Sequence, residues 1–305
     1  MSENAEAAPQ ALQFQPFSIG AAIKYLPTIM KKSPKDLRIV TINTWKGEGL
    51  YDWRLQLMAR DLYALEPDIV CLQEAVRSTD FQIDTADFLA DYLQMEMVYT
   101  PARCKMRTVG SRQNTSSFEF LTYSGLAILS SGSIERHWIS PMPAHPEDAE
   151  RLAFSAQIYH NRRLITVTNL HLTHVQDADK LRYQQFLSVL LKYSDIAPSS
   201  AWICCGDFNQ TIDEKMIESL EKDSNLQIND CYLKGHGELP GATLVPTEQR
   251  PENCRIDYIF TMQQKGQSPL QCRNGHIVLN SPDFEGYYPS DHFGVSVDIH
   301  FLPER

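Results

Sequence analysis

The chain has 305 residues, of which 43% are hydrophobic and 22% charged, a composition typical of a globular protein that can bury a large core. Its net charge is −10 at pH 7 and its pI is about 5.4, which argues against a protein that binds nucleic acid through a uniformly basic surface. A nuclease is not excluded, because a metal ion and local basic loops can attract a polyanion.

We expect neither a secretory signal nor a membrane span at the beginning of the chain. It lacks the basic segment of a secretory signal, and its mildly apolar run 17–30 is interrupted by Lys24 and Pro27. This run is too short to span a bilayer, so we expect no transmembrane segment. We expect residues 1–35 to be a loosely ordered extension and residues 36–305 to form the functional domain.

The seven cysteines occur without the paired spacing of a metal or redox motif. Cys71, Cys204 and Cys205 lie in apolar runs, where a cysteine usually behaves as a small core residue. We therefore expect reduced thiols and a cytoplasmic protein. Nothing in the sequence determines the oligomeric state, and we expect a monomer.

Strands and helices alternate in the first half of the chain. Apolar runs predict strands at 37–43, 68–73, 95–100 and 124–130. Asp52 is predicted to cap a helix that Pro67 terminates, and a second helix is predicted near 87–94.

A polar stretch at 101–120 carries several cations in this acidic chain, namely Arg103, Lys105, Arg107 and Arg112. We expect a solvated loop. The alternative is a loop that contacts substrate phosphates, since basic side chains are the usual partners of phosphate groups.

The second half continues the same alternation. Strands are predicted at 152–159, 163–170, 202–205, 255–260 and 293–301. Asp177 and Asp213 are predicted to cap helices, and the proline- or glycine-bearing stretches 139–150 and 235–253 are predicted to be loops. No repeat or linker divides the chain. We therefore expect one α/β domain built as a four-layer sandwich, with two mixed sheets packed face to face and helices on both outer sides.

Polar side chains recur where the predicted strands begin or end. The strand ends carry Asn43, Glu74, His171, Asp207 with Asn209, and Asp291 with His292. Carboxylates, amides and imidazoles can hold a metal, orient a water molecule or transfer a proton. Their recurrence at strand ends predicts a hydrolytic site at one edge of the sheets.

Seven short motifs support this interpretation. They are Thr-Ile-Asn (41–43), Leu-Gln-Glu (72–74), Ser-Gly-Leu-Ala-Ile-Leu-Ser (124–130), Asn-Leu-His-Leu (169–172), Gly-Asp-Phe-Asn (206–209), Arg-Ile-Asp-Tyr-Ile-Phe (255–260) and Ser-Asp-His (290–292). With these seven motifs in this order, the chain resembles the endonuclease/exonuclease/phosphatase superfamily, which has the DNase I-like fold. The resemblance runs from Ile39 to about Val297.

The resemblance implies a metal site. Glu74 is implied as the principal metal carboxylate, with Asn43 beside it and Asp291 on the far side. Oxygen ligands of this kind suit Mg²⁺, with Mn²⁺ as a second possibility.

The resemblance also implies the catalytic groups. His292 is implied as the proton-transfer residue, oriented by Asp257, and His171 as a donor to the phosphoryl oxygen. Asp207 and Asn209 are implied to orient the attacking water and contact the scissile phosphate, which gives in-line hydrolysis. His174, three residues after His171, is expected to be a loop histidine.

The resemblance to this family does not determine the substrate. We expect a phosphodiester of nucleic acid or a related compound, and the alternatives are a sphingomyelinase-type lipid phosphodiesterase and a small phosphomonoester phosphatase. A non-catalytic binding protein on the same fold is less favoured, since the implied catalytic groups are all present. The candidates for substrate binding are Arg103, Arg107, Arg112, Tyr287 and Tyr288.

Overall fold

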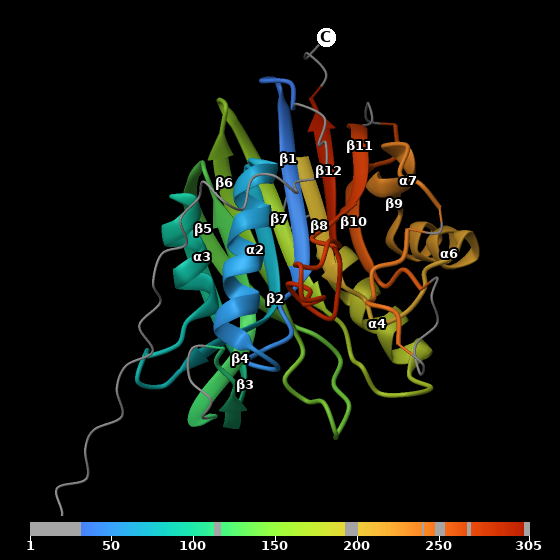
Figure 1. Ribbon diagram of the computed structural model, residues 1–305. Helices are drawn as coiled ribbons and strands as arrows, with labels where there is room; N and C mark the ends of the chain where they lie inside the picture. Colours follow the sequence, from blue (N-terminus) through green and yellow to red (C-terminus); the bar gives the residue numbers. More distant parts are fainter. Residues whose placement is uncertain are drawn as a thin grey trace, which may run out of the picture.

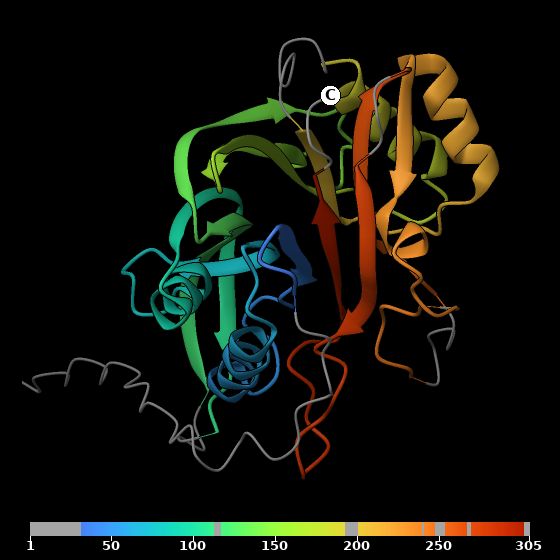
Figure 2. The same ribbon diagram turned by 90° about the horizontal axis from the view of Figure 1, so that it is seen from above.

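The computed structural model describes residues 32–112, 117–192, 201–239, 241–247, 254–266 and 270–301. In this part of the chain the strands form two six-stranded sheets that face each other, and helices lie on their outer sides (Figures 1 and 2). Residues 1–31 lie outside the described residues, so the expected N-terminal extension remains a prediction.

The elements follow the alternation that the sequence predicts. The strands are β1 (Asp36–Asn43), β2 (Ile69–Ser78), β3 (Glu96–Val109), β4 (Phe118–Ser130), β5 (Ser133–Pro141), β6 (Leu152–His160), β7 (Arg163–His171), β8 (Ala201–Asp207), β9 (Leu226–Asp230), β10 (Asp257–Gln264), β11 (Gln271–Val278) and β12 (Gly294–His300). The helices are α2 (Tyr51–Leu65), α3 (Thr85–Leu93), α4 (Asp179–Leu190), α6 (Glu214–Ser224) and α7 (Cys231–Lys234).

Both sheets are mixed. The first has the strand order β11-β12-β1-β2-β4-β3, and the second has the order β5-β6-β7-β8-β10-β9. The pairs β1–β2 and β7–β8 are parallel, and the other paired strands are antiparallel. Figure 2 shows α2 and α3 outside the first sheet and α4 and α6 outside the second. The predicted four-layer α/β sandwich is confirmed.

Alternation along the strands builds separate cores on the two faces of each sheet. In β1, Leu37 and Ile39 face the second sheet, whereas Val40 and Ile42 pack in the cluster that includes α2 and α3. On the other side, α4 and α6 pack on the outer face of the second sheet in a cluster that includes Trp202. Because every central strand is buried on both faces, these strands read as continuous apolar runs in the sequence.

The prediction of a solvated loop at 101–120 is wrong in its described part. Residues 101–109 continue β3, and residues 118–120 begin β4. The two strands pair from Glu96–Ser130 to Val109–Phe118 and extend beyond the body of the sheet. Much of this extension is exposed, so it lacks the apolar alternation by which a strand is recognised.

Two of the predicted helix caps also need correction. Asp213 caps α6 as predicted, since its side chain accepts the backbone N–H of Met216 at 2.9 Å. Asp52 instead lies in the first turn of α2, where it accepts the Ser111 hydroxyl at 2.6 Å and so links the helix to the end of β3. Asp177 precedes Ala178, the residue at the N-cap of α4.

The predicted loop 139–150 also begins inside a strand, because β5 extends to Pro141. The sequence patterns do not predict β5, β9 and β11, which are all edge strands of the sheets. Among the described residues, no helix is both long and apolar enough to cross a membrane.

Candidate active site

The predicted site residues meet at one edge of the sandwich because of strand direction and register. Asn43, His171 and Asp207 are the last residues of β1, β7 and β8. Glu74 does not end its strand as predicted, because β2 continues to Ser78; it lies at an irregularity in the β2–β4 pairing, next to Gln73, the register partner of Asn43. Since β10 runs antiparallel to β8, its first residue, Asp257, lies directly opposite Asp207. His171 is the register partner of Asp207 on the other side.

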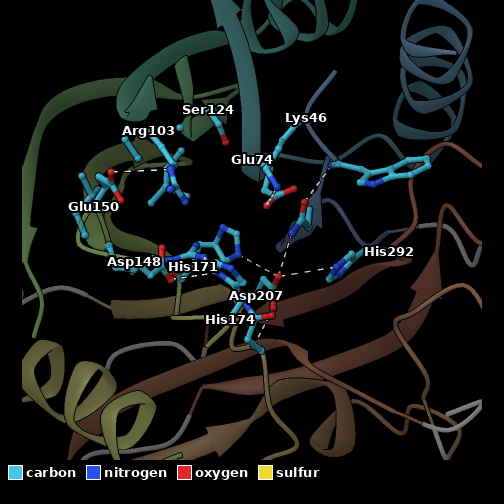
Figure 3. Close-up of a pocket in the computed structure, with 18 of the residues that line it drawn as sticks. Lys46, Glu74, Arg103, Ser124, Asp148, Glu150, His171, His174, Asp207 and His292 are labelled. Carbon is cyan, nitrogen blue, oxygen red and sulfur yellow. Dashed lines mark hydrogen bonds and ion pairs between the residues drawn. The ribbon is translucent and has the colours of Figure 1, made fainter. Parts of the chain in front are cut away.

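A cleft of about 390 Å³ opens at this edge (Figure 3). Its lining includes seven of the eight residues predicted to be catalytic or metal-binding, namely Asn43, Glu74, His171, Asp207, Asn209, Asp291 and His292. The eighth, Asp257, is fully buried behind His292. The residues predicted from the sequence therefore form one cluster.

Asp207 is the centre of the polar contacts. Its Oδ2 accepts a hydrogen bond from Asn43 Nδ2 at 3.0 Å and lies 3.4 Å from His171 Nε2 and 3.9 Å from His292 Nε2. Its Oδ1 accepts the backbone N–H of Asn209 at 2.8 Å. The carboxylate thus joins groups from both sheets, as the dashed lines in Figure 3 show for the residues drawn.

Gly206 allows this close approach. It has a φ of 140°, and a β-carbon there would lie 1.9 Å from the backbone oxygen of Leu170. Only glycine fits between β7 and β8 at this point. The Gly-Asp sequence therefore brings Asp207 against His171.

His292 and Asp257 form a buried pair. Nδ1 of His292 lies 3.0 Å from Oδ2 of Asp257, so a proton on Nδ1 fixes the ring orientation and leaves Nε2 facing the cleft. Burial opposes a charge on His292, but Asp257 and then Asp207 outweigh it and raise the pKa of His292 to about 10. Burial, followed by the charge of Asp257, raises the pKa of Asp207 to about 6.

His171 has the opposite electrostatic environment. Burial, followed by the positive charges of Arg151 and Lys46, holds its pKa well below the usual value of 6.5. At neutral pH it is therefore an uncharged imidazole that can donate one N–H to a substrate oxygen. His171 and His292 thus carry different charges, which suits different roles.

These shifts predict how stability depends on pH in the metal-free protein. Below about pH 6.5 the unfolded chain takes up a proton at His171 that the folded chain resists, so stability falls as the pH drops. His292 acts in the opposite direction, since its contribution is present below about pH 6.5 and is lost as the pH rises to about 10.

Urea unfolding in EDTA from pH 5 to 10 measures both effects. His171→Asn should flatten the acid limb and His292→Asn the alkaline limb, each by up to about 1.4 kcal/mol per pH unit. Stability curves of both variants that run parallel to the wild type would contradict these charge states.

The oxygen donors beside this pair fit a divalent metal. Asn43, Glu74, Asp207 and Asp291 line the same cleft and offer carboxylate or amide oxygens. Glu74 has a φ of 54° at an irregularity in the β2–β4 pairing, and Lys46 Nζ lies 2.6 Å from its Oε1. The Glu74 carboxylate thus already binds one positive charge, the ammonium group of Lys46.

A second cluster of possible metal ligands is less suited to this role. One ligand atom from each of Asp207, Asp257 and His292 lies within 4.8 Å of the others. A metal bound among them would compete with the proton on His292 Nδ1 for Asp257. The hydrogen-bonded arrangement therefore fits proton transfer better than metal binding.

Arg54 holds the two loops that carry the site. Its buried guanidinium donates to the backbone oxygens of Thr44, Glu48 and Pro289 at 3.1, 2.9 and 2.9 Å, and it stacks on Trp45 at 4.8 Å. Burial lowers the pKa of Arg54 to about 10. Arg54 thereby connects the loop after Asn43 with the loop that precedes Asp291.

The predicted substrate-binding residues fall into three groups. Arg103 and Arg107 line the cleft. Tyr287 and Tyr288 line a neighbouring, largely apolar pocket of about 780 Å³, which shares Trp45 and Asp291 with the cleft. Arg112 is not among the residues that line either pocket; it stacks on Trp53 and pairs with Glu285 at 2.6 Å.

Sequence reasoning missed two cations of the cleft, Lys46 and Arg151. Lys46 lies in the loop after β1, three residues beyond Asn43, and no motif marks it. Arg151 lies just before β6 and carries no motif; it pairs with Asp148 and donates to His174. His174 lies in a loop as expected, but it also lines the cleft.

The two facing sheets, with acids and histidines gathered at one edge, define the DNase I-like class of fold. The sequence model of the endonuclease/exonuclease/phosphatase family matches residues 40–292. The chain belongs to this family. Its members are in general hydrolytic phosphoesterases that depend on a divalent metal.

Solved structures show the same fold. An endonuclease/exonuclease/phosphatase family protein from Leptotrichia buccalis has a TM-score of 0.65 and 18% identity, over 87% of this chain and all of that chain. D. rerio TDP2 complexed with a single-strand DNA product gives 0.65 and 17%, over 87% of this chain and 99% of that chain. The human Nocturnin catalytic domain with bound sulfate gives 0.63 and 20%, over 89% and 97%. No curated protein sequence matches the chain.

Proposed function

We propose that this protein hydrolyses a phosphodiester, of nucleic acid or a related compound, by in-line attack of water with Mg²⁺ or Mn²⁺ as the cofactor. The observation that carries the proposal is the buried Asp257–His292 pair, whose Nε2 faces Asp207 in a cleft also lined by metal-competent oxygens. Membership of the family supports the reaction class.

The two carboxylates and His292 account for the protons. Asp207 accepts a hydrogen bond from the attacking water and takes its proton as the new P–O bond forms. His292, protonated because Asp257 and Asp207 raise its pKa, gives a proton to the oxygen that leaves phosphorus. A proton returned from Asp207 to His292 then restores both groups.

The remaining polar groups position the phosphate. Asn209 contacts the scissile group, and neutral His171 donates its N–H to a phosphoryl oxygen. Glu74, Asn43 and Asp291 would hold the metal ion, which neutralises charge on the phosphate when bound. A non-catalytic protein would have no need of these protonation states in one cleft.

A panel of substrates tests the proposal. The wild-type protein is offered single-stranded DNA, single-stranded RNA, sphingomyelin, an aryl phosphodiester and an aryl phosphomonoester, each with Mg²⁺ or EDTA. We expect metal-dependent cleavage of a nucleic acid and of the aryl phosphodiester. Preference for sphingomyelin or for the monoester would instead support one of the two alternative activities. No metal-dependent cleavage of any substrate would contradict the proposal.

A further inference from the structure

A row of three cations on β3 lines one wall of the cleft. Arg103, Lys105 and Arg107 occupy alternate positions of the strand, and all three line the cleft that contains Asp207. Alternate residues of a strand point to the same face and are about 6.6–6.8 Å apart, so the row extends over about 13 Å. We call these three residues the β3 cationic ladder.

The positive charge of the ladder is poorly neutralised. The nearest acid to Arg103 is Glu150, with Nε and Oε1 4.0 Å apart and both side chains about half exposed, at 48% and 43%. Among the described residues, Lys105 and Arg107 have no acidic partner within ion-pair distance. The other cations of the cleft differ, since Lys46 and Arg151 each pair with a carboxylate at 2.6 Å.

Arg107 is the deepest member of the ladder. It is 5% exposed, and its Nη1 donates to the backbone oxygen and the hydroxyl of Thr122 at 3.0 and 2.6 Å. Its Nε and Nη2 have no hydrogen-bond partner among the described residues. Buried donors without partners are uncommon, and a guanidinium held this way contributes a fixed positive charge to the wall.

We propose that the β3 cationic ladder binds the phosphates that neighbour the scissile one, so that the substrate is a single strand with several phosphodiester linkages. This inference rests on the proposed function and specifies its substrate class. A net charge of −10 makes non-specific attraction of a polyanion unfavourable, so a local row of cations that are only weakly paired with acids has a specific use here.

The same charge argues against a choline lipid. A sphingomyelin headgroup carries one phosphate and a quaternary ammonium, and a wall of three cations repels the ammonium. A strand places one negative charge after another along the wall, so each cation gains a partner. The ladder therefore favours a nucleic-acid substrate over sphingomyelin.

The salt dependence of binding tests the ladder without requiring hydrolysis. The wild type and the double variant Arg103→Ser/Lys105→Ser are titrated in EDTA with fluorescent ten-residue oligothymidine and oligouridine, from 50 to 300 mM salt. Both residues are exposed, so the fold should tolerate the change. The control is Lys215→Ser/Lys222→Ser on the exposed face of α6, which alters the net charge equally.

Removing two phosphate contacts should reduce the slope of log K against log[salt] by about 1.4 and weaken binding roughly tenfold or more. Arg107→Lys, which keeps the charge but not the fork of donors, should weaken binding less than the double variant. The control should match the wild type, and a difference between the two oligonucleotides would identify DNA or RNA as the better ligand.

Two outcomes would overturn the ladder: wild-type protein that binds neither oligonucleotide, or equal slopes and affinities in the double variant and its control. Hydrolysis with Mg²⁺ is measured separately. Cleavage of the aryl phosphodiester with unchanged salt slopes refutes the ladder and leaves the proposed function standing. A reduced slope without cleavage of any substrate refutes the proposed function and supports only the binding of single strands by the ladder.

Discussion

His292→Asn should lower kcat for phosphodiester hydrolysis by about 10²–10⁴-fold at saturating Mg²⁺, with a smaller change in KM. The substitution removes the only group in the proposal that protonates the leaving oxygen, and it leaves the packing of β12 intact because residue 292 precedes that strand. Initial rates on an oligonucleotide, whose alkoxide leaving group needs a proton, measure the effect with substrate and metal both saturating.

A matched control exists at the end of β12, the strand that follows His292. His300 also pairs with an acid, with its Nδ1 2.6 Å from Asp36 Oδ1, but it lies at the other end of β12. His300→Asn should keep wild-type kcat. Loss of activity in both variants, or retention of most activity in His292→Asn, would refute the proton-transfer role.

The pH profile of a variant at Asp257 tests the same Asp257–His292 pair in a second way. Asp257 raises the pKa of His292, so Asp257→Asn should move the alkaline limb of the kcat–pH profile to lower pH. A purely structural role for Asp257 would change stability and leave that limb in place.

Glu74→Gln should lower metal-dependent kcat/KM by about 10²-fold or more and weaken Mn²⁺ binding measured by calorimetry without substrate. The variant keeps the volume of the side chain but loses the charge that Lys46 now neutralises. That ion pair is partly exposed, so its loss should cost no more than about 1 kcal/mol of stability. The unfolding temperature in EDTA should therefore change little.

Glu119→Gln is the control for the loss of one exposed carboxylate, since Glu119 lies on β4 and is not among the residues that line the cleft. It should bind Mn²⁺ as the wild type does. Wild-type metal affinity and turnover in Glu74→Gln would show that the metal is held elsewhere.

The central strands were predictable because they have no solvated face. Runs such as 37–43 and 202–205 are buried on both sides, so most of their residues are apolar and the pattern is clear. The extension of β3 and β4 lacks that constraint. Its polar residues predict a loop, because exposure on one face and a charged cleft on the other remove the apolar alternation.

The site was predictable to the extent that its residues end buried strands. Gly206 and Asp207 illustrate the reason, since the glycine is needed for close strand packing and the acid must then emerge beside His171. The positions of Lys46, Arg151 and the ladder residues in the cleft depend on how loops and the β3–β4 hairpin fold over it. Sequence spacing does not encode those long-range contacts.

The most direct test of the account is hydrolysis of bis(p-nitrophenyl) phosphate, which requires no assumption about the natural substrate. The wild type and Glu74→Gln are compared in the same assay with Mg²⁺, with Mn²⁺ and with EDTA. We expect p-nitrophenol release by the wild type with a metal, and at least about 10²-fold less release by the variant or in EDTA. Release that is independent of both metal and Glu74, or no release by the wild type with either metal, would contradict the account.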